Sequence, residues 1–118
     1  MGKIMNAKIT STQLGIEDHG CFTWMLFLDL ADGCGCGFGG WCLDHYDKRL
    51  DKRICGEGAT AILEILNVIG VENWEDLKGQ YCRVEMTEDG CSIKAIGNII
   101  KDKWFNPKEL FKAFGWGE

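Results

Sequence analysis

The residues of this chain best suited to metal or thiol chemistry stand in two short polar clusters. Residues 18–21 read Asp-His-Gly-Cys, and residues 42–45 read Cys-Leu-Asp-His. Thiolate and imidazole are ligand types that zinc accepts in tetrahedral sites. We therefore expect a zinc site with the ligands His19, Cys21, Cys42 and His45. Asp44 is either a substitute ligand or a hydrogen-bond partner of one of these four.

The two clusters meet only if the segment between them folds back on itself. An apolar run covers Phe22–Leu30, a turn composition follows at Ala31–Gly33, and glycine alternates with larger residues over Gly35–Trp41. Such a pattern predicts two antiparallel strands joined by a tight turn. Because Phe22–Leu30 is apolar on both faces, we expect it to be a central strand of a sheet.

The predicted hairpin also determines which residues face each other. With a turn centred near the Asp32-Gly33 pair, the numbers of facing residues sum to about 65. Cys21 then lies opposite Asp44, and Cys42 lies opposite Thr23. Both histidines of the chain are close to these positions in sequence, so the hairpin brings the proposed ligands together.

Two other interpretations of these cysteines stay open, because the clusters contain no Cys-x-x-Cys knuckle. In the first, His19 and Cys21 only shape a turn, and Cys42 is a small buried hydrophobic residue. In the second, Cys21 or Cys42 is a catalytic nucleophile with a nearby histidine as its base. A neighbouring aspartate, Asp18 or Asp44, would orient that histidine. Nothing in the sequence supplies an oxyanion hole or a substrate pocket, so we expect no enzymatic activity.

The returning strand has glycine at every second position, which leaves one of its faces bare. This face favours an alternative function, a small-molecule or nucleotide-binding module with the glycine-rich strand as its floor. Large side chains such as Trp41 or Trp104 could fill the same space instead. The strand also contains Cys34 and Cys36, which with Cys55 give three metal donors but no fourth.

Periodicity and capping signals predict the remaining elements. They are strands over Lys3–Thr12, Tyr81–Thr87 and Ser92–Ile100, helices over Gly58–Ile69 and from Pro107 onward, a capped turn at Asn73–Leu77, and a surface loop or short helix over Leu43–Cys55. Together they make an α+β fold, an antiparallel sheet of about five strands with two helices packed on one face, in the order βββαββα.

The composition restricts the class of protein. A chain of 118 residues, 46% of them hydrophobic, suits a single domain over residues 1–118. A net charge of −5 argues against direct binding to nucleic acid, which needs clustered Lys and Arg. No apolar run reaches membrane-spanning length, and the first residues do not form a signal peptide. We therefore expect a cytoplasmic protein whose seven cysteines are free thiols or metal ligands.

Five tryptophans are many for a chain of this length. Trp24 lies in the expected central strand and should be part of the core. Trp41, Trp104 and Trp116 are expected to anchor a protein interface, because Trp is enriched among binding hot spots. Hydrophobic capping of the sheet edge is the alternative role for the C-terminal tail that contains Trp116.

Short motifs spread over most of the chain form a further pattern. They are residues 18–21, Phe38–Gly40 with an aromatic residue next, Leu43-Asp44, Tyr46-Asp47, Trp74–Gly79 and Ile99–Phe105. In these motifs the chain resembles a family of small proteins carried by phages and prophages of Gram-positive bacteria. Some small phage proteins of this general type are anti-CRISPR inhibitors of type II effectors.

The resemblance implies a phage accessory protein that binds and inhibits a host defence protein in the bacterial cytoplasm, with a Cas nuclease as the expected partner. An acidic surface could dock against the basic channel in which such a nuclease holds nucleic acid. We expect Asp44, Asp47 and Asp51 to lie in this interface together with the three tryptophans. Zinc would then stabilise the base of the hairpin and take no part in catalysis.

Overall fold

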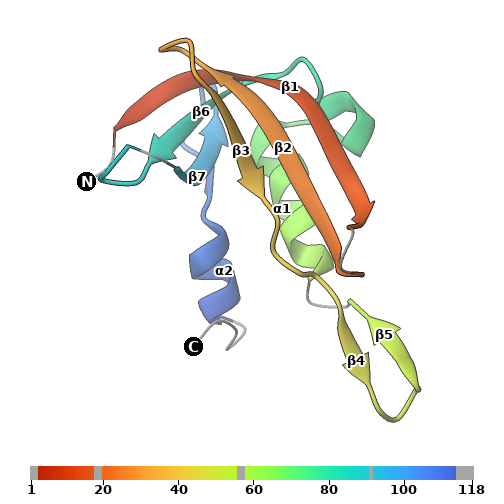
Figure 1. Ribbon diagram of the computed structural model, residues 1–118. Coiled ribbons are helices and arrows are strands. Elements are labelled where there is room, and N and C mark those ends of the chain that lie inside the picture. The colour runs from red at the N-terminus through yellow and green to blue at the C-terminus, as the bar shows by residue number, and fades with distance from the viewer. Residues whose placement is uncertain (1–2, 18–19, 56–57, 91, 114–118) are drawn as a thin grey trace.

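The computed structural model describes residues 3–17, 20–55, 58–90 and 92–113. These residues form a six-stranded sheet in the order β3-β2-β1-β6-β7-β8, a separate two-stranded sheet β4-β5, and two α-helices (Figure 1). In chain order the elements are β1 (Ile4–Ile16), β2 (Phe22–Leu30), β3 (Gly35–Gly39), β4 (His45–Asp47), β5 (Lys52–Ile54), α1 (Ala59–Ile69), the 3₁₀ turn η1 (Trp74–Leu77), β6 (Tyr81–Met86), β7 (Ile93–Asn98), β8 (Trp104–Phe105) and α2 (Pro107–Ala113). The predicted α+β class is confirmed, but the number and order of strands differ from the prediction.

β1 joins the two halves of the large sheet. Its first part, Ile4–Lys8, pairs with β6, and Ala7–Ile16 pairs with β2. The register of β1 against β2 shifts at Thr10, whose Oγ1 donates a hydrogen bond of 3.0 Å to the Phe27 carbonyl. A bulge of this kind bends a strand and increases its twist, and β1 is visibly curved in Figure 1. β1 also continues to Ile16, beyond the end predicted at Thr12.

The core lies between the large sheet and α1. β2 contributes Trp24, Leu26 and Leu28, and α1 contributes Ile65, all nearly inaccessible to solvent. α1 ends where expected, because Gly70 adopts a left-handed conformation (φ 94°) and its N–H donates to the Leu66 carbonyl.

The buried face of α1 contains Ala61, Ile65 and Val68, whereas the apolar residue Leu63 is 67% exposed. Leu63 is two residues from both Ala61 and Ile65, so at 3.6 residues per turn it lies on the other side of the helix. α2 reaches the same core with Leu110, so side chains of both helices contact one cluster.

The register predicted for the β2–β3 hairpin is wrong by one residue. Leu26 faces Phe38 and Asp29 faces Gly35, so the numbers of facing residues sum to 64. The turn is a three-residue loop, in which the Leu30 N–H donates to the Cys34 carbonyl at 2.8 Å. Such a loop places one residue in the left-handed region, and Gly33 does this with φ 93°. Cys21 and Cys42 therefore do not occupy the ladder positions predicted for them.

The prediction of a loop or short helix over Leu43–Cys55 is also wrong, because this segment contains the β4–β5 hairpin. The hairpin projects away from the rest of the protein (Figure 1). We call residues 44–54 the arm, and the remainder of the described chain the body.

Candidate functional site

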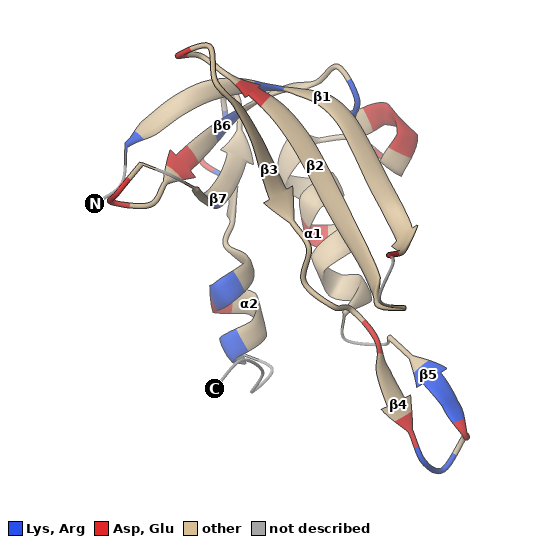
Figure 2. Cartoon of the chain, in the orientation of Figure 1, with Lys and Arg blue, Asp and Glu red and all other residues tan. Residues whose placement is uncertain are grey.

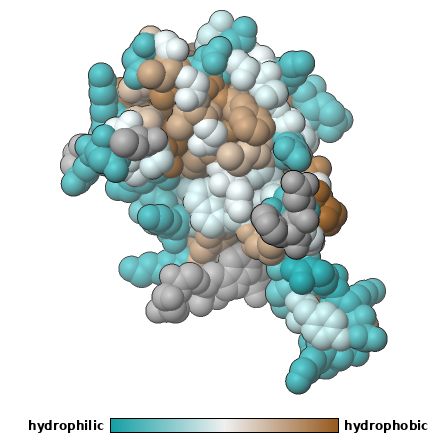
Figure 3. Space-filling view, in the orientation of Figure 1, coloured by the Kyte–Doolittle hydropathy of each residue, from teal (hydrophilic) through white to brown (hydrophobic). Residues whose placement is uncertain are grey.

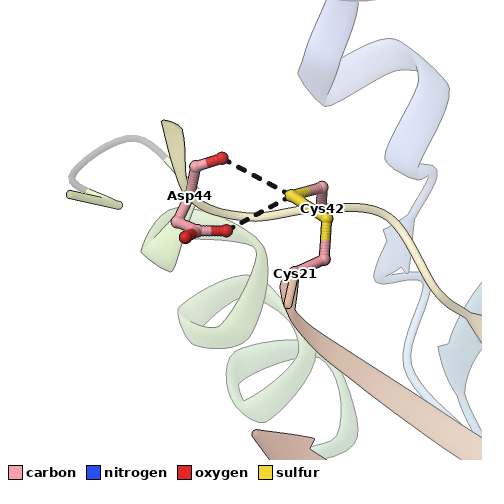
Figure 4. A group of neighbouring side chains, drawn as sticks. All are labelled: Cys21, Cys42 and Asp44. Carbon is pink, nitrogen blue, oxygen red and sulfur yellow. Dashed lines mark hydrogen bonds between the residues drawn. A yellow bond between two sulfur atoms is a disulfide. The ribbon is translucent and has the colours of Figure 1, made fainter. Parts of the chain in front are cut away.

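Cys21 and Cys42 meet at the base of the arm and form a disulfide, with their Cα atoms 5.4 Å apart (Figure 4). The N–H of Leu43 donates to the Phe22 carbonyl at 2.8 Å, which holds the two cysteine-bearing segments side by side. Asp44 is the third member of the group, since its Oδ1 lies 3.2 Å from Cys42 Sγ. Cys21, Cys42 and Asp44 thus converge as expected, although the two cysteines are joined by a disulfide that was not predicted.

Of the two histidines expected as ligands, His45 is described by the structure and is not part of this group. His45 is exposed on β4, and the three neighbouring donors within 4.8 Å of one another are Cys21, Cys42 and Asp44. His19 lies outside the described residues. The structure therefore brings together two of the four predicted zinc ligands, with the predicted substitute as the third.

Asp44 links the arm to the body. Its Oδ1 accepts a 3.0 Å hydrogen bond from the Phe22 N–H, and its Oδ2 forms an ion pair with the Arg53 guanidinium. The hydrogen bond from the Arg53 side chain lowers the pKa of Asp44 to about 2, with burial opposing the shift and the Phe22 N–H adding to it. The Asp44 side chain is only 8% exposed, so a charged, fully bonded carboxylate fixes the base of the arm.

Disulfide and metal are mutually exclusive states of the same two sulfur atoms, because only the thiolate binds a metal. In the disulfide state, Cys42 can act neither as a ligand nor as a nucleophile. In the reduced state, two thiolates and one carboxylate would suit zinc in type and number for three of its four positions. The Arg53 guanidinium contacts Asp44 Oδ2, whereas Oδ1 is the carboxylate oxygen that lies beside Cys42 Sγ.

The three carboxylates predicted to face a partner are bonded within the protein. Asp44 pairs with Arg53, and Asp47 Oδ1 accepts hydrogen bonds from the N–H groups of Arg49 and Leu50. Asp51 accepts a hydrogen bond from the Tyr46 hydroxyl, and this bond raises the Tyr46 pKa. These carboxylates therefore shape the arm, and their role in an interface stays a prediction.

The exposed side chains of the arm are mainly basic and partly apolar. The arm has three acidic residues and four basic ones, the latter being Lys48, Arg49, Lys52 and Arg53. The net charge of −5 consequently comes from residues outside the arm, and blue segments dominate β5 and the tip in Figure 2. Tyr46 is 53% exposed and Leu50 is 56% exposed.

Tyr46 and Leu50 were not expected as contact residues from the sequence, and Arg53 was not expected as the partner of Asp44. The pairing of Arg53 with Asp44 can be inferred only once the hairpin is known, because β4 and β5 bring together residues that are nine positions apart in sequence. Alternating charges of opposite sign over this segment were the available hint.

Two of the three tryptophans expected at an interface have partners within the body. Trp41 is half-buried, with ring centroids 5.8 Å from Trp24 and 5.9 Å from Phe111. Trp104 is half-buried too, under the Arg83 guanidinium at 5.0 Å, and its Nε1 donates to Asp102. Trp116 lies outside the described residues. As predicted, Trp24 is fully buried.

The space beside Gly37 and Gly39 of the glycine-rich strand is occupied by residues of β2, whereas Gly35 has no such close neighbour. A Cβ atom on Gly37 would lie 2.7 Å from Met25 Cε, and one on Gly39 would lie 2.7 Å from the Trp24 ring. The space needed over Gly37 for a nucleotide is therefore filled by the protein's own methionine. A nearby hollow between β1 and β2, lined in part by Gln13 and Thr23, has a volume of about 190 Å³, below the usual range of ligand pockets.

The remaining described cysteines form no second metal centre in this part of the chain. Cys34, Cys36 and Cys55 are free and at least partly accessible, and none belongs to a group of three neighbouring donors. Cys82 is buried in β6, and burial raises the pKa of its thiol to about 12.

Comparison with models of known protein families finds none that matches this chain, and a search of curated proteins also finds no match. Among the described residues, no helix combines the length and the apolar character needed to cross a membrane. The family resemblance drawn from the sequence motifs therefore stays a prediction.

Proposed function

We propose that this protein acts by binding another protein through the arm and catalyses no reaction. The observation that carries the proposal is a projecting hairpin, fixed at its base, that exposes Tyr46 and Leu50 among basic side chains. Tyrosine is enriched in binding hot spots, since it supplies a large contact area with few rotatable bonds. In the body, Trp24 and Phe38 are buried in the core, whereas Tyr81, whose ring lies under the Lys8 ammonium, is 60% exposed.

The anchoring at the base supports this proposal because a pre-organised loop loses less conformational entropy on binding. The Cys21–Cys42 disulfide ties the segment that enters the arm to the start of β2. The Asp44–Arg53 ion pair closes the hairpin at the same place. The arm can therefore present its tip in one orientation before a partner arrives.

The sequence resemblance supplies the class of partner, a host defence protein and in particular a Cas nuclease. The nucleic-acid channel of such a nuclease is basic, and the negative charge of this protein resides in residues outside the arm. We propose that the acidic body faces the channel while the arm contacts an adjoining surface. Opposite charges would speed the encounter, and the exposed arm residues would add specificity.

For the reduced protein in a bacterial cytoplasm, we propose that zinc takes the place of the disulfide. Cys21, Cys42 and Asp44 would bind the ion, and His19 is the fourth ligand that the sequence offers. Native mass spectrometry of protein purified under reducing conditions without added metal tests this point. A mass excess of one zinc ion that disappears on denaturation supports the proposal, whereas the bare polypeptide mass removes it.

The function is tested by inhibition of DNA cleavage by a purified type II Cas nuclease. Replacing residues 45–54 by a short Gly-Ser linker should abolish inhibition, because the contact residues Tyr46 and Leu50 are removed. The matched pair of substitutions is finer: Tyr46→Ala with Leu50→Ala in the arm, against Leu63→Ala with Ile100→Ala on the body. All four side chains are more than half exposed, so only the arm variant should lose affinity, by about tenfold or more.

Three results of this experiment would contradict parts of the proposal. Full inhibition by the linker variant would show that the arm is not the contact surface. Equal loss in both double variants would point to a contact spread over the body. Failure of the unmodified protein to bind or inhibit any type II nuclease would overturn the proposed class of partner.

A further inference from the structure

The second half of β1 has a neighbouring strand on one side only. β6 pairs with Ile4–Lys8, and the Ile9 backbone bonds with Gly79 and Gln80 just before β6. Beyond Ile9, β2 is the one strand paired with β1 in the described part of the chain. Figure 1 shows this half of β1 at the outer rim of the sheet, with no strand beside it on the far side.

The hydrogen bonds that β2 makes on its other side show in which direction the free backbone groups of β1 point. The carbonyl groups of Phe22 and Trp24 accept hydrogen bonds from Leu43 and Gly40, on the β3 side. In an antiparallel ladder both backbone groups of one residue point to the same side. Their partners across the ladder, Ile16 and Leu14, therefore direct their N–H and C=O groups away from β2.

Thr12 shares this direction because strand residues two apart are equivalent. Along the described chain, no backbone group outside β2 hydrogen-bonds to residues 12–16. Three N–H and three C=O groups thus form an open edge.

The side chains along this edge make it suitable for contact. Leu14 is 39% exposed and Ile16 is 67% exposed, and both lie on the same face of the strand. Brown atoms reach the right-hand rim of the molecule in Figure 3, beside the end of β1. Residues 11–16 contain no charged residue and no proline. Natural proteins usually protect an open strand edge with such residues, so this edge is unprotected in the monomer.

We infer that the open edge of β1 pairs with the same edge of a second copy of this chain. An antiparallel pairing about a two-fold axis at Leu14 places Leu14 opposite itself and Thr12 opposite Ile16 of the second copy. Every residue with outward backbone groups then faces another such residue, and the six free groups of each copy are satisfied. The interface is isologous, as in most two-fold dimers.

A second copy fits this edge better than a foreign charged segment. The protein has a net charge of −5, which disfavours self-association wherever acidic residues meet. The uncharged stretch 11–16 is a place where two copies can approach without that repulsion, and Leu14 and Ile16 would cover each other's exposed surface. The inference does not depend on the proposed function, but a dimer would present two arms and so increase the avidity for a partner.

The test is the molar mass of the full chain, measured by sedimentation velocity over a range of concentrations. The unmodified protein should form a dimer, and Leu14→Lys and Leu14→Glu should each weaken it about tenfold or more, since like charges would then face each other. An equimolar mixture of the two variants should restore the dimer, because the introduced lysine of one copy faces the introduced glutamate of the other. Leu63→Lys, on the exposed side of α1, should leave the dimer unchanged.

If mixing the two variants restores the dimer, then each variant had lost its pairing and not its fold, because two misfolded variants would not form a dimer when mixed. A monomer at all concentrations overturns the inference. So does a dimer that both Leu14 variants retain, or one that Leu63→Lys abolishes. Protection of the amides of Thr12, Leu14 and Ile16 from hydrogen exchange only when a partner protein is added would assign the edge to that partner instead.

Discussion

The β2–β3 hairpin and the arm follow one another in the chain, yet they are stabilised in opposite ways. The first is part of the large sheet and buries Leu26 and Phe38 as facing residues. The second is a free two-stranded sheet in which every residue of β4 and β5 is at least partly accessible to solvent. Its shape depends on bonds between side chains, such as that between Asp44 and Arg53, and on the disulfide at its base.

Because of this difference, the two hairpins are suited to different roles. A strand that buries large apolar side chains is stabilised by the core and leaves few groups to offer a partner. An isolated two-stranded hairpin is marginally stable in water, so the arm depends on the disulfide and the ion pair at its base. Because these bonds lie at the base, the tip stays exposed. We take the first hairpin as the support and the second as the contact element.

The largest expected effect distinguishes the two hairpins by truncating one aromatic residue in each. Phe38→Ala should lower the free energy of unfolding by about 3–5 kcal/mol, the usual cost of removing a buried phenylalanine. Phe38 is 2% exposed, and its ring lies 5.4 Å from that of Trp24. Tyr46→Ala should cost about 0.5 kcal/mol, as is typical for an exposed position. Urea denaturation followed by fluorescence measures both values.

The two variants serve as controls for each other. Equal losses of stability would mean that the arm belongs to the same cooperative core as the sheet. In that case the arm could not be treated as a separate contact element.

The sequence predicted the first hairpin well because burial leaves a pattern. The run of apolar residues located β2 at both of its ends, Phe22 and Leu30. The register was missed by one residue because Ala31–Gly33 is compatible with a two- or a three-residue loop. Only the left-handed conformation of Gly33 decides between them.

The arm left no such pattern, so its structure could not be predicted. Its charged residues read as a solvated loop, and the pairs that hold it together become visible only in three dimensions. The meeting of Cys21 and Cys42 was foreseen from the hairpin, whereas the bond between them was not. A cytoplasmic protein was expected to keep its thiols reduced.

The next largest effect concerns the disulfide at the base of the arm. Cys42→Ser should lower the stability of the oxidised protein by about 3 kcal/mol, because a cross-link that closes a loop of this size restricts the unfolded chain. The two cysteines are 21 residues apart in sequence. Cys34→Ser, in the turn of the first hairpin, is the matched control, since Cys34 is free and exposed.

Thermal unfolding with and without a dithiol reductant checks this prediction. Reductant should bring the unmodified protein down to the level of Cys42→Ser and leave that variant unchanged. Equal stability of the unmodified protein under both conditions would contradict a structural role for the disulfide.

The smallest effect is the pH dependence of the Asp44–Arg53 pair. The pKa of Asp44 is lowered from 3.8 to about 2 by Arg53, so the folded protein favours the charged carboxylate. The resulting stabilisation is complete above about pH 4 and is lost as the pH falls towards about 2. Arg53 is half exposed, so solvent screening keeps the contribution of the pair to stability small.

Asp44→Asn should therefore lower the melting temperature at pH 7 and have a much smaller effect near pH 2, where the Asp44 carboxylate of the unmodified protein is about half protonated in the folded state and almost fully protonated in the unfolded state. Asparagine keeps an oxygen that can accept the hydrogen bond from Phe22, so the difference reports on charge. Asp32→Asn is the control from the first hairpin, because Asp32 accepts a hydrogen bond from the Cys34 N–H and has no ion pair in the described structure. If both variants showed the same pH dependence, the charge of Asp44 would have no special role. A dependence confined to Asp44→Asn would show that the arm, unlike the core hairpin, is held partly by an electrostatic bond at its base.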